Sequence, residues 1–327
     1  MIVNSLASLC LAAALALSQP LLLTPTPLGG GEVAELRRLR LPDGLVFPNG
    51  IASDADGSLY VGGVTSGQVW RRDPAGDWTI LFPGSPTVYG VTSLRLDAER
   101  GVLWGASPDA AAVLGVEAGR EARPHRVFAL DIRTGAVLGS AVVPEGGFGN
   151  DLALDGQGGV LVSDSRLGRI WRLAPDVSTW TLAASDPALD PGNGIGPAGI
   201  ARLPSGDLIV GLFGQGCLVR VRRPGPDAVV EPIMIDRAVL RPDGMAAIDD
   251  QRVVLTLGGT GEVIVVDLGS GRTRRLAAGL RGPVNVDLRG FIVLVSESGI
   301  VDPADFDPAR PDRSGMSVVQ LVLEALP

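Results

Sequence analysis

Several residue types are rare or absent in this chain of 327 residues, and each absence excludes a class of chemistry. There is no lysine, so all 28 basic residues are arginine and a lysine-bearing phosphate loop cannot be present. His125 is the single histidine, which excludes a multi-histidine metal centre and a catalytic histidine pair. The two cysteines are Cys10 and Cys217. If the segment holding Cys10 is removed, Cys217 stands alone and no internal disulfide can form.

Aromatic residues are also few, at 4%, whereas glycine (45) and proline (25) are abundant. This composition is typical of many short strands joined by tight turns and argues against a helical bundle. The net charge of −8 argues against a nucleic-acid partner, because such a polyanion would be repelled. We therefore expect an all-β protein, whose length is compatible with one closed domain.

An apolar run over residues 5–17 is followed by a spacer rich in proline and glycine that reaches Gly31. The sequence Ala16-Leu17-Ser18 has the small-x-small pattern of a cleavage site. Residues 1–31 are therefore predicted to be a signal peptide and spacer, and the mature protein to be periplasmic or secreted, with no membrane attachment after cleavage. The run is preceded by no Lys or Arg, so a tail that is not exported stays as the alternative.

The rest of the chain repeats one short phrase about six times, in which a loop cluster leads into an apolar strand, a turn and a second apolar strand. The clearest copies open with Pro48-Asn49-Gly50-Ile51-Ala52, Gly149-Asn150-Asp151-Leu152-Ala153, Pro197-Ala198-Gly199-Ile200-Ala201 and Pro242-Asp243-Gly244-Met245-Ala246. Weaker copies open with Thr92-Ser93-Leu94 and Pro283-Val284-Asn285. A period in the forties is typical of propellers and repeat arrays.

Two further strand patterns follow each pair, so six repeats of four strands predict a six-bladed β-propeller over residues 32–327. The last repeat is one strand short, and residues 32–41 alternate like a strand. We expect this N-terminal strand to complete the last blade and close the ring, because closure leaves no unpaired edge.

Two long loops, residues 107–124 and 299–315, interrupt the regular spacing between second and third strands. In an up-and-down blade they lie on the same face as the start of each phrase. They are predicted either to cover a site as lids or to be tolerated surface insertions.

The second residue of the phrase varies while its frame does not, and we take this series as a candidate site. It consists of Asn49, Ser93, Asn150, Ala198, Asp243 and Asn285, with Asp151 beside it. Each of these residues would begin an innermost strand, so they are predicted to converge on one mouth of the channel. Amide and carboxylate oxygens suit a hard cation such as Ca²⁺. The alternative is that Asn and Asp only cap turns at these positions.

These phrases, each followed by a strand of the Leu-Tyr-Val type, resemble the regucalcin/gluconolactonase-like propellers, a superfamily that includes calcium-dependent lactonases and strictosidine-synthase-like proteins. The resemblance extends from about residue 45 to 322. It implies a divalent cation held by Asn49, Asn150 and Asp243. The sequence departs from the family's pattern twice, because Asn49 stands where a Glu is usual and Ala198 where another Asn is expected.

The resemblance also implies metal-assisted ring opening of a lactone or ester, in which the cation polarises the carbonyl group and lowers the pKa of a bound water. Asp151 is then the candidate general base. Ser93, Asn285 and His125 are candidate substrate contacts, although a lone His beside arginines is more often a surface residue. The partner would be a small molecule and the protein a monomer. The alternative is a non-catalytic propeller that binds a small molecule or a protein at the same mouth.

Overall fold

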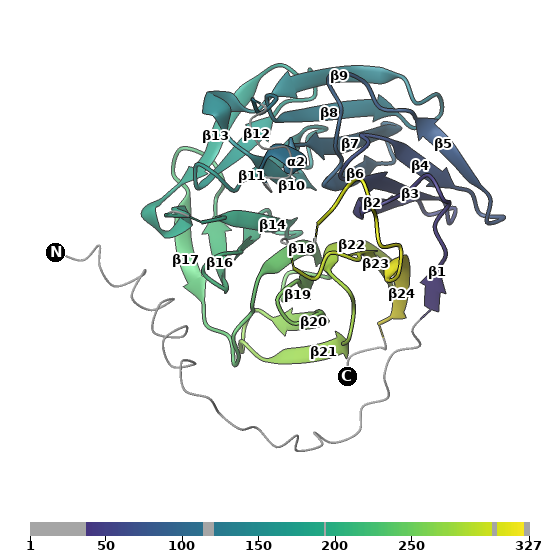
Figure 1. Ribbon diagram of the computed structural model, residues 1–327. Helices are drawn as coiled ribbons and strands as arrows, with labels where there is room; N and C mark the ends of the chain where they lie inside the picture. The colour runs from purple at the N-terminus through teal and green to yellow at the C-terminus, as the bar shows by residue number, and fades with distance from the viewer. Residues whose placement is uncertain (1–36, 114–120, 193, 303–305, 324–327) are drawn as a thin grey trace.

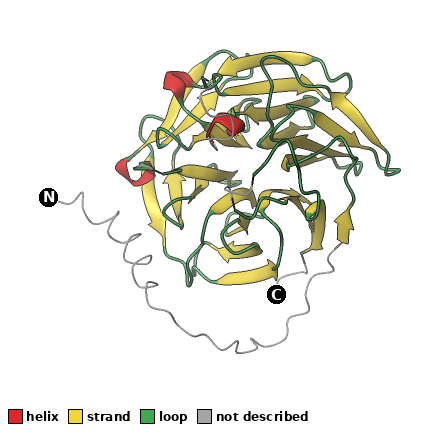
Figure 2. Ribbon diagram, in the orientation of Figure 1, coloured by secondary structure: helices red, strands yellow, loops and turns green. Residues whose placement is uncertain are grey.

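The computed structural model describes residues 37–113, 121–192, 194–302 and 306–323. They form six antiparallel sheets of four strands each, arranged as a ring (Figure 1), and strands dominate the described chain (Figure 2). The structure confirms the six-bladed β-propeller. The predicted signal peptide and spacer, residues 1–31, lie outside the described residues.

Each blade runs from its innermost to its outermost strand, and in blades 1 to 5 this is also the order along the chain. Blade 1 has β2 (Pro48–Ser53), β3 (Leu59–Gly63), β4 (Val69–Arg72) and β5 (Trp78–Phe82); blade 2 has β6 (Ser93–Asp97), β7 (Val102–Ser107), β8 (Arg126–Asp131) and β9 (Val137–Val142); blade 3 has β10 (Gly149–Leu154), β11 (Val160–Asp164), β12 (Arg169–Leu173) and β13 (Trp180–Ser185).

The other three blades follow the same plan, and blade 6 takes its outermost strand from the N-terminal part of the chain. Blade 4 has β14 (Pro197–Arg202), β15 (Leu208–Leu212), β16 (Cys217–Arg222) and β17 (Val229–Ile233); blade 5 has β18 (Pro242–Ala247), β19 (Arg252–Leu257), β20 (Glu262–Asp267) and β21 (Thr273–Ala277); blade 6 has β22 (Pro283–Arg289), β23 (Ile292–Ser298), β24 (Met316–Val322) and β1 (Arg37–Leu39).

The described helices are short: α2 (Ala110–Val113) and two 3-10 turns, η1 (Pro144–Gly146) and η2 (Pro187–Leu189). Within the described ranges, none is long and apolar enough to cross a bilayer.

The hydrophobic core lies between neighbouring blades. The second strands β3, β11 and β15 are buried along their whole length, because both faces of each sheet are covered by another blade. Between blades 2 and 3, for example, Trp104 and Val127 pack in one cluster with Leu152 and Val162. These buried Val, Leu and Ile side chains hold the blades in the ring, so the inner strands are fixed in position around the channel.

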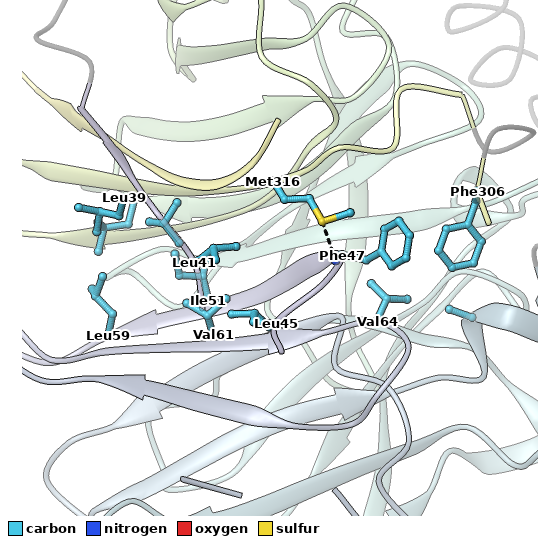
Figure 3. Close-up of a cluster of buried hydrophobic side chains, with 13 residues drawn as sticks. Leu39, Leu41, Leu45, Phe47, Ile51, Leu59, Val61, Val64, Phe306 and Met316 are labelled. Atoms are coloured by element: carbon cyan, nitrogen blue, oxygen red, sulfur yellow. Dashed lines mark hydrogen bonds between the residues drawn. The ribbon is translucent and has the colours of Figure 1, made fainter. Parts of the chain in front are cut away.

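The ring is closed where β1 pairs with β24, with Arg37 opposite Gln320 and Leu39 opposite Val318. This confirms the predicted closure, with β1 beginning at Arg37 as the first described residue. The cluster in Figure 3 seals the joint: Leu39 packs with side chains of blades 1 and 6, and the backbone N–H of Phe47 donates to Met316 Sδ at 3.3 Å. Leu39 is 6% exposed, so even this short edge strand contributes to the core.

Both long loops connect second and third strands, as predicted: one joins β7 to β8 and the other joins β23 to β24. They therefore lie at the face where the innermost strands begin, which we call the anchor face. Residues 114–120 and 303–305 of these loops lie outside the described residues.

Candidate functional site

The innermost strands begin with a bulge. In five of the six blades the pairing between the first and second strands shifts by one residue directly after the first strand residue. Bulges of this kind are common at the rims of closed sheets, where they redirect side chains. The bulge explains why the phrase has a constant frame and a variable second residue, since the extra residue is free of the regular ladder.

The pairing also fixes which residues are equivalent. The buried apolar residue of each phrase stands opposite a second-strand residue, as Ile51 does opposite Val61. Counting two residues back from it gives the rim position, with Asn49, Thr92, Asn150, Ala198, Asp243 and Val284. Counting one residue back gives the inner position, with Gly50, Ser93, Asp151, Gly199, Gly244 and Asn285.

This register corrects the predicted series at two places. Ser93 and Asn285 are not equivalent to Asn49, because they occupy the inner position together with Asp151. Their burial agrees, at 0% and 2% exposed, whereas Asn49 is half-buried. The physical reason is that the apolar core residue sets the register, and a shift of one residue moves a side chain to another environment.

The rim position brings the three predicted metal ligands onto alternate blades. Asn49 lies on blade 1, Asn150 on blade 3 and Asp243 on blade 5, and all three are half-buried. Asn150 donates through Nδ2 to Ser165 Oγ at 2.9 Å, which leaves its Oδ1 as an available acceptor. Ala198, on blade 4, is fully buried and supplies no side-chain ligand.

The inner position is closely packed between blades. A Cβ atom at Gly244 would lie 2.4 Å from Asn285 Cα, and one at Gly199 would lie 1.7 Å from the carbonyl oxygen of Asp243. Glycine is therefore required at the inner position of these blades, because the backbone of the next blade's rim or inner residue lies too close to leave room for a Cβ atom. Blade 3 carries Asp151 at this position instead, so a carboxylate is buried where three other blades have no side chain.

Asp151 is 1% exposed, and both of its oxygens accept hydrogen bonds. Ser93 Oγ donates to Oδ1 at 2.6 Å, and the backbone N–H of Ile200 donates to Oδ2 at 3.1 Å. Arg95 Nη2 lies 3.0 Å from Oδ1 and 3.1 Å from Oδ2. Asn285 Nδ2 lies 3.4 Å from Oδ1, so the structure brings Ser93, Asp151 and Asn285 into one network.

Arg95 is the residue that sequence reasoning missed. Its guanidinium starts from blade 2 and reaches three other blades, because it contacts Asp151 on blade 3, the carbonyl oxygen of Met245 on blade 5 (3.3 Å) and Asn285 Oδ1 on blade 6 (3.2 Å). It therefore crosses the channel. The sequence does contain a signal for Arg95. The fifth residue of the phrase is alanine in four copies, whereas the second copy has Arg95 at that position.

The electrostatics single out Asp243. Burial raises the pKa of its carboxyl group well above the usual value, and the negative charge of Asp151 raises it further. No hydrogen bond or ion pair from another described side chain offsets this cost for Asp243. A carboxylate in this position favours either a proton or a cation.

The residues present fit a divalent cation in their chemistry. One carboxylate and two amide oxygens are hard ligands, and Ca²⁺ takes six to eight oxygens, so the remaining places would fall to water or substrate. The described residues contain no cluster of three or more His, Cys, Asp or Glu that could hold a metal ion, and Asp243 is the single acid at the rim position. With one negative charge among the three candidate ligands, we predict weak binding of the cation.

His125 lies on the anchor face beside blade 3 and is 7% exposed. Its Nδ1 accepts the backbone N–H of Asp109 at 3.1 Å, and its ring lies 4.7 Å from the ring of Phe148, two residues before Asn150. Burial lowers the pKa of the imidazole, which keeps it neutral near pH 7. No hydrogen bond joins it to the described rim residues.

A cavity of about 240 Å³ opens on the anchor face beside blade 1. It lies between Phe47, which directly precedes β2, and the loop between β23 and β24, with Arg281, Arg310 and Asp312 in its lining. This loop thus borders a space next to the rim, as a lid would.

No protein-family profile and no curated protein sequence matches this chain. Solved structures do match. Virginiamycin B lyase from Staphylococcus aureus shares 14% sequence identity at a TM-score of 0.61, over 89% of this chain and 99% of the lyase. A calcium-binding protein, regucalcin, from Agrobacterium tumefaciens shares 17% identity at a TM-score of 0.60, over 86% of this chain and 91% of that protein.

A protein named as a candidate gluconolactonase also shares 17% identity, at a TM-score of 0.61, over 88% of this chain and 92% of that protein. At these identities the likeness shows the fold. The chain has the six-bladed fold of the regucalcin and gluconolactonase-like structures, which confirms the sequence resemblance at that level.

Proposed function

We propose that this protein is an exported hydrolase of small lactones or esters that works at the anchor face, with a divalent cation held by Asn49, Asn150 and Asp243. The observation that carries the proposal is the Asp243 carboxyl group, which is half-buried at the rim and has a pKa raised by burial and by Asp151. A cation beside Asp243 would relieve the repulsion between the two acids.

The cation, when bound, would polarise the carbonyl group of the substrate and lower the pKa of a bound water. The chain's own residues would do the rest. Asn49 and Asn150 orient the substrate and the cation by their amide oxygens. Asp243 supplies the negative charge at the rim, and the neutral His125 borders the same face beside Asn150.

Asp151 takes a positioning role in this proposal rather than that of the general base predicted from the sequence. Its oxygens are occupied by Ser93, Arg95 and a backbone N–H, and its 1% exposure leaves no direct path for a water at the rim. It acts through Asp243, whose pKa it raises, and through Arg95, which it holds across the channel.

The metal site is tested by thermal unfolding of the mature protein with calcium chloride and with chelator. Calcium at roughly a hundredfold excess over its Kd should add about 2.7 kcal/mol to the free energy of unfolding. Asp243→Asn should remove the shift, whereas the exposed control Asp77→Asn should keep it. Identical melting curves with calcium and chelator would refute the cation site.

Catalysis is tested on a panel of γ- and δ-lactones and aryl esters. We expect hydrolysis that requires the cation and is lost in Asp243→Asn. Export is tested by the N-terminal sequence of the secreted or periplasmic protein, which should begin close to Gln19.

The second candidate is a non-catalytic binding propeller, which one observation favours: the rim has a single carboxylate, and the acid below it is fully hydrogen-bonded. It predicts saturable binding of lactones without turnover.

A further inference from the structure

The channel has a second cavity at the face opposite the anchor face. Each innermost strand begins at the anchor face and ends at the hairpin to its second strand, and a cavity of about 330 Å³ is lined by the last residues of these strands in blades 3 to 6. This volume is within the range of small-molecule sites. Arg95 forms part of its lining from the channel side.

The cavity exists because one repeat position is small. The residue after the buried apolar residue of each phrase is Ala52, Ala153, Ala201 or Ala246 in four blades. The two exceptions are Arg95 in blade 2 and Asp287 in blade 6, both of which line the cavity. The small alanine side chains leave the space open, and the charged side chains of Arg95 and Asp287 line it.

The next repeat position carries a third charge. Its residues are Ser53, Leu96, Leu154, Ala247 and Leu288 in five blades, and Arg202 in blade 4. Arg202 thus stands where every other blade has a small or apolar residue. Nothing in the repeat architecture requires a guanidinium there.

The Arg202 guanidinium lies against the hairpin between β10 and β11. A Cβ atom at Gly156 would lie 3.2 Å from Arg202 Nη1 and 3.4 Å from Nη2, so this glycine leaves room for the guanidinium. Arg202 makes no hydrogen bond or ion pair with a side chain in the described part of the chain. Arg95, by contrast, is already paired with Asp151.

At another point of the lining, Asp287 accepts a hydrogen bond from Ser53 Oγ at 2.5 Å through Oδ2. Its other oxygen can accept from a ligand hydroxyl. Ile200 and Met245 contribute apolar wall between the charged groups. The cavity therefore offers a free cation, an apolar wall and an acceptor, which together select a carboxylate that also carries a hydroxyl group.

We propose that this cavity is a binding site for a small hydroxycarboxylate, whose carboxylate pairs with Arg202 and whose hydroxyl donates to Asp287. The site is separate from the rim where the proposed hydrolysis occurs, because the hydrogen-bonded network of Arg95, Asp151 and Asn285 lies between them along the inner strands.

The test is isothermal titration of the mature protein with 6-hydroxyhexanoate, compared with hexanoate and 6-hydroxyhexanamide. We expect saturable binding of 6-hydroxyhexanoate, weaker binding of hexanoate because the hydroxyl is missing, and none of the uncharged amide. Arg202→Gln should weaken binding at least about tenfold, since a charge-assisted pair is lost. The control Arg133→Gln, at an exposed turn, should bind as the wild type does.

Ala247→Leu provides a second variant, which fills the cavity from blade 5 and alters no charged residue. It should also weaken binding. Asp243→Asn, which removes the proposed cation ligand at the rim, should leave this binding unchanged, so failure of the proposed function can be told from failure of this site. No saturable binding up to about 10 mM, or equal affinity in the wild type and Arg202→Gln, would overturn the proposal.

Discussion

Arg95 of β6 and Asp151 of β10 form a buried ion pair inside the propeller channel, with Nη2 to Oδ1 at 3.0 Å and side chains only 11% and 2% exposed. The pair ties blade 2 to blade 3, and the same guanidinium also reaches blades 5 and 6. A single arginine thus links four of the six blades from within. It also lies between the rim residues and the cavity at the opposite face, whose lining it joins.

Breaking this pair should be costly. Arg95→Met leaves Asp151 charged and buried without its partner, so the free energy of unfolding should fall by about 3–5 kcal/mol. The double variant Arg95→Met/Asp151→Asn should lose less than the sum of the two single variants, because the remaining group is neutral. Urea unfolding measures all three.

The control for this experiment is Arg222→Met. Arg222 pairs with Glu231 on the outer strands of blade 4, where both side chains are 47% exposed. The urea midpoint of Arg222→Met should stay close to that of the wild type, because exposed ion pairs contribute little to the free energy of unfolding. If Arg95→Met were no more destabilising than Arg222→Met, the channel pair would not hold the blades together.

The Asp243 carboxyl group should oppose folding at neutral pH when no cation is present. Its pKa is raised in the folded protein, so between the usual carboxyl value and the raised value the folded state binds more protons than the unfolded state. Stability from this group therefore falls as the pH rises through that window. Asp243→Asn removes the titration, so its gain in melting temperature over the wild type should grow from pH 4 towards neutral pH.

A constant difference between the two proteins across this pH range would contradict the raised pKa. Adding calcium should reduce the difference at neutral pH, since the cation binds only the ionised carboxylate of the wild type.

The glycine of the phrase should be intolerant of a methyl group. At Gly244 a Cβ would meet Asn285 Cα at 2.4 Å and the carbonyl oxygen of Val284 at 2.8 Å, and both contacts are with backbone. Gly244→Ala should therefore cost about 1–3 kcal/mol by overpacking. The control is Gly269→Ala, whose Cβ would meet only side-chain atoms at ordinary contact distance, Gln251 Oε1 at 3.5 Å and Asp267 Oδ1 at 3.6 Å. Comparable melting temperatures for the two variants would argue against the close approach of blades 5 and 6.

The sequence predicted the architecture well because hydrophobic alternation and turn residues are local signals that recur six times. It also placed Asn49, Asn150 and Asp243 correctly at equivalent positions, since each stands two residues before a buried apolar residue. Ser93 and Asn285 were matched by residue type instead, and the pairing shows them one position nearer that residue.

The role of Arg95 could not be read from local patterns, because its partners Asp151 and Asn285 lie 56 and 190 residues away in the chain. An arginine in an apolar inner strand signals a buried partner without identifying it. The cavity at the opposite face follows from alanine in four repeats, which is visible in the sequence only once the register is known.

His125 should give the protein a second pH dependence, of opposite sign to that of Asp243. Burial lowers the pKa of the imidazole below 6.5, so below that pH the unfolded state binds more protons and stability is lost as the pH falls. In His125→Asn the side-chain oxygen can still accept the N–H of Asp109, which His125 Nδ1 accepts at 3.1 Å. The difference in melting temperature between wild type and variant cancels the Asp243 contribution. The melting temperature of the wild type relative to the variant should be lower at pH 5 than at pH 7.5. Since the chain has one histidine, no other imidazole contributes to this change. A difference that does not vary with pH would mean that His125 is not buried as a neutral group.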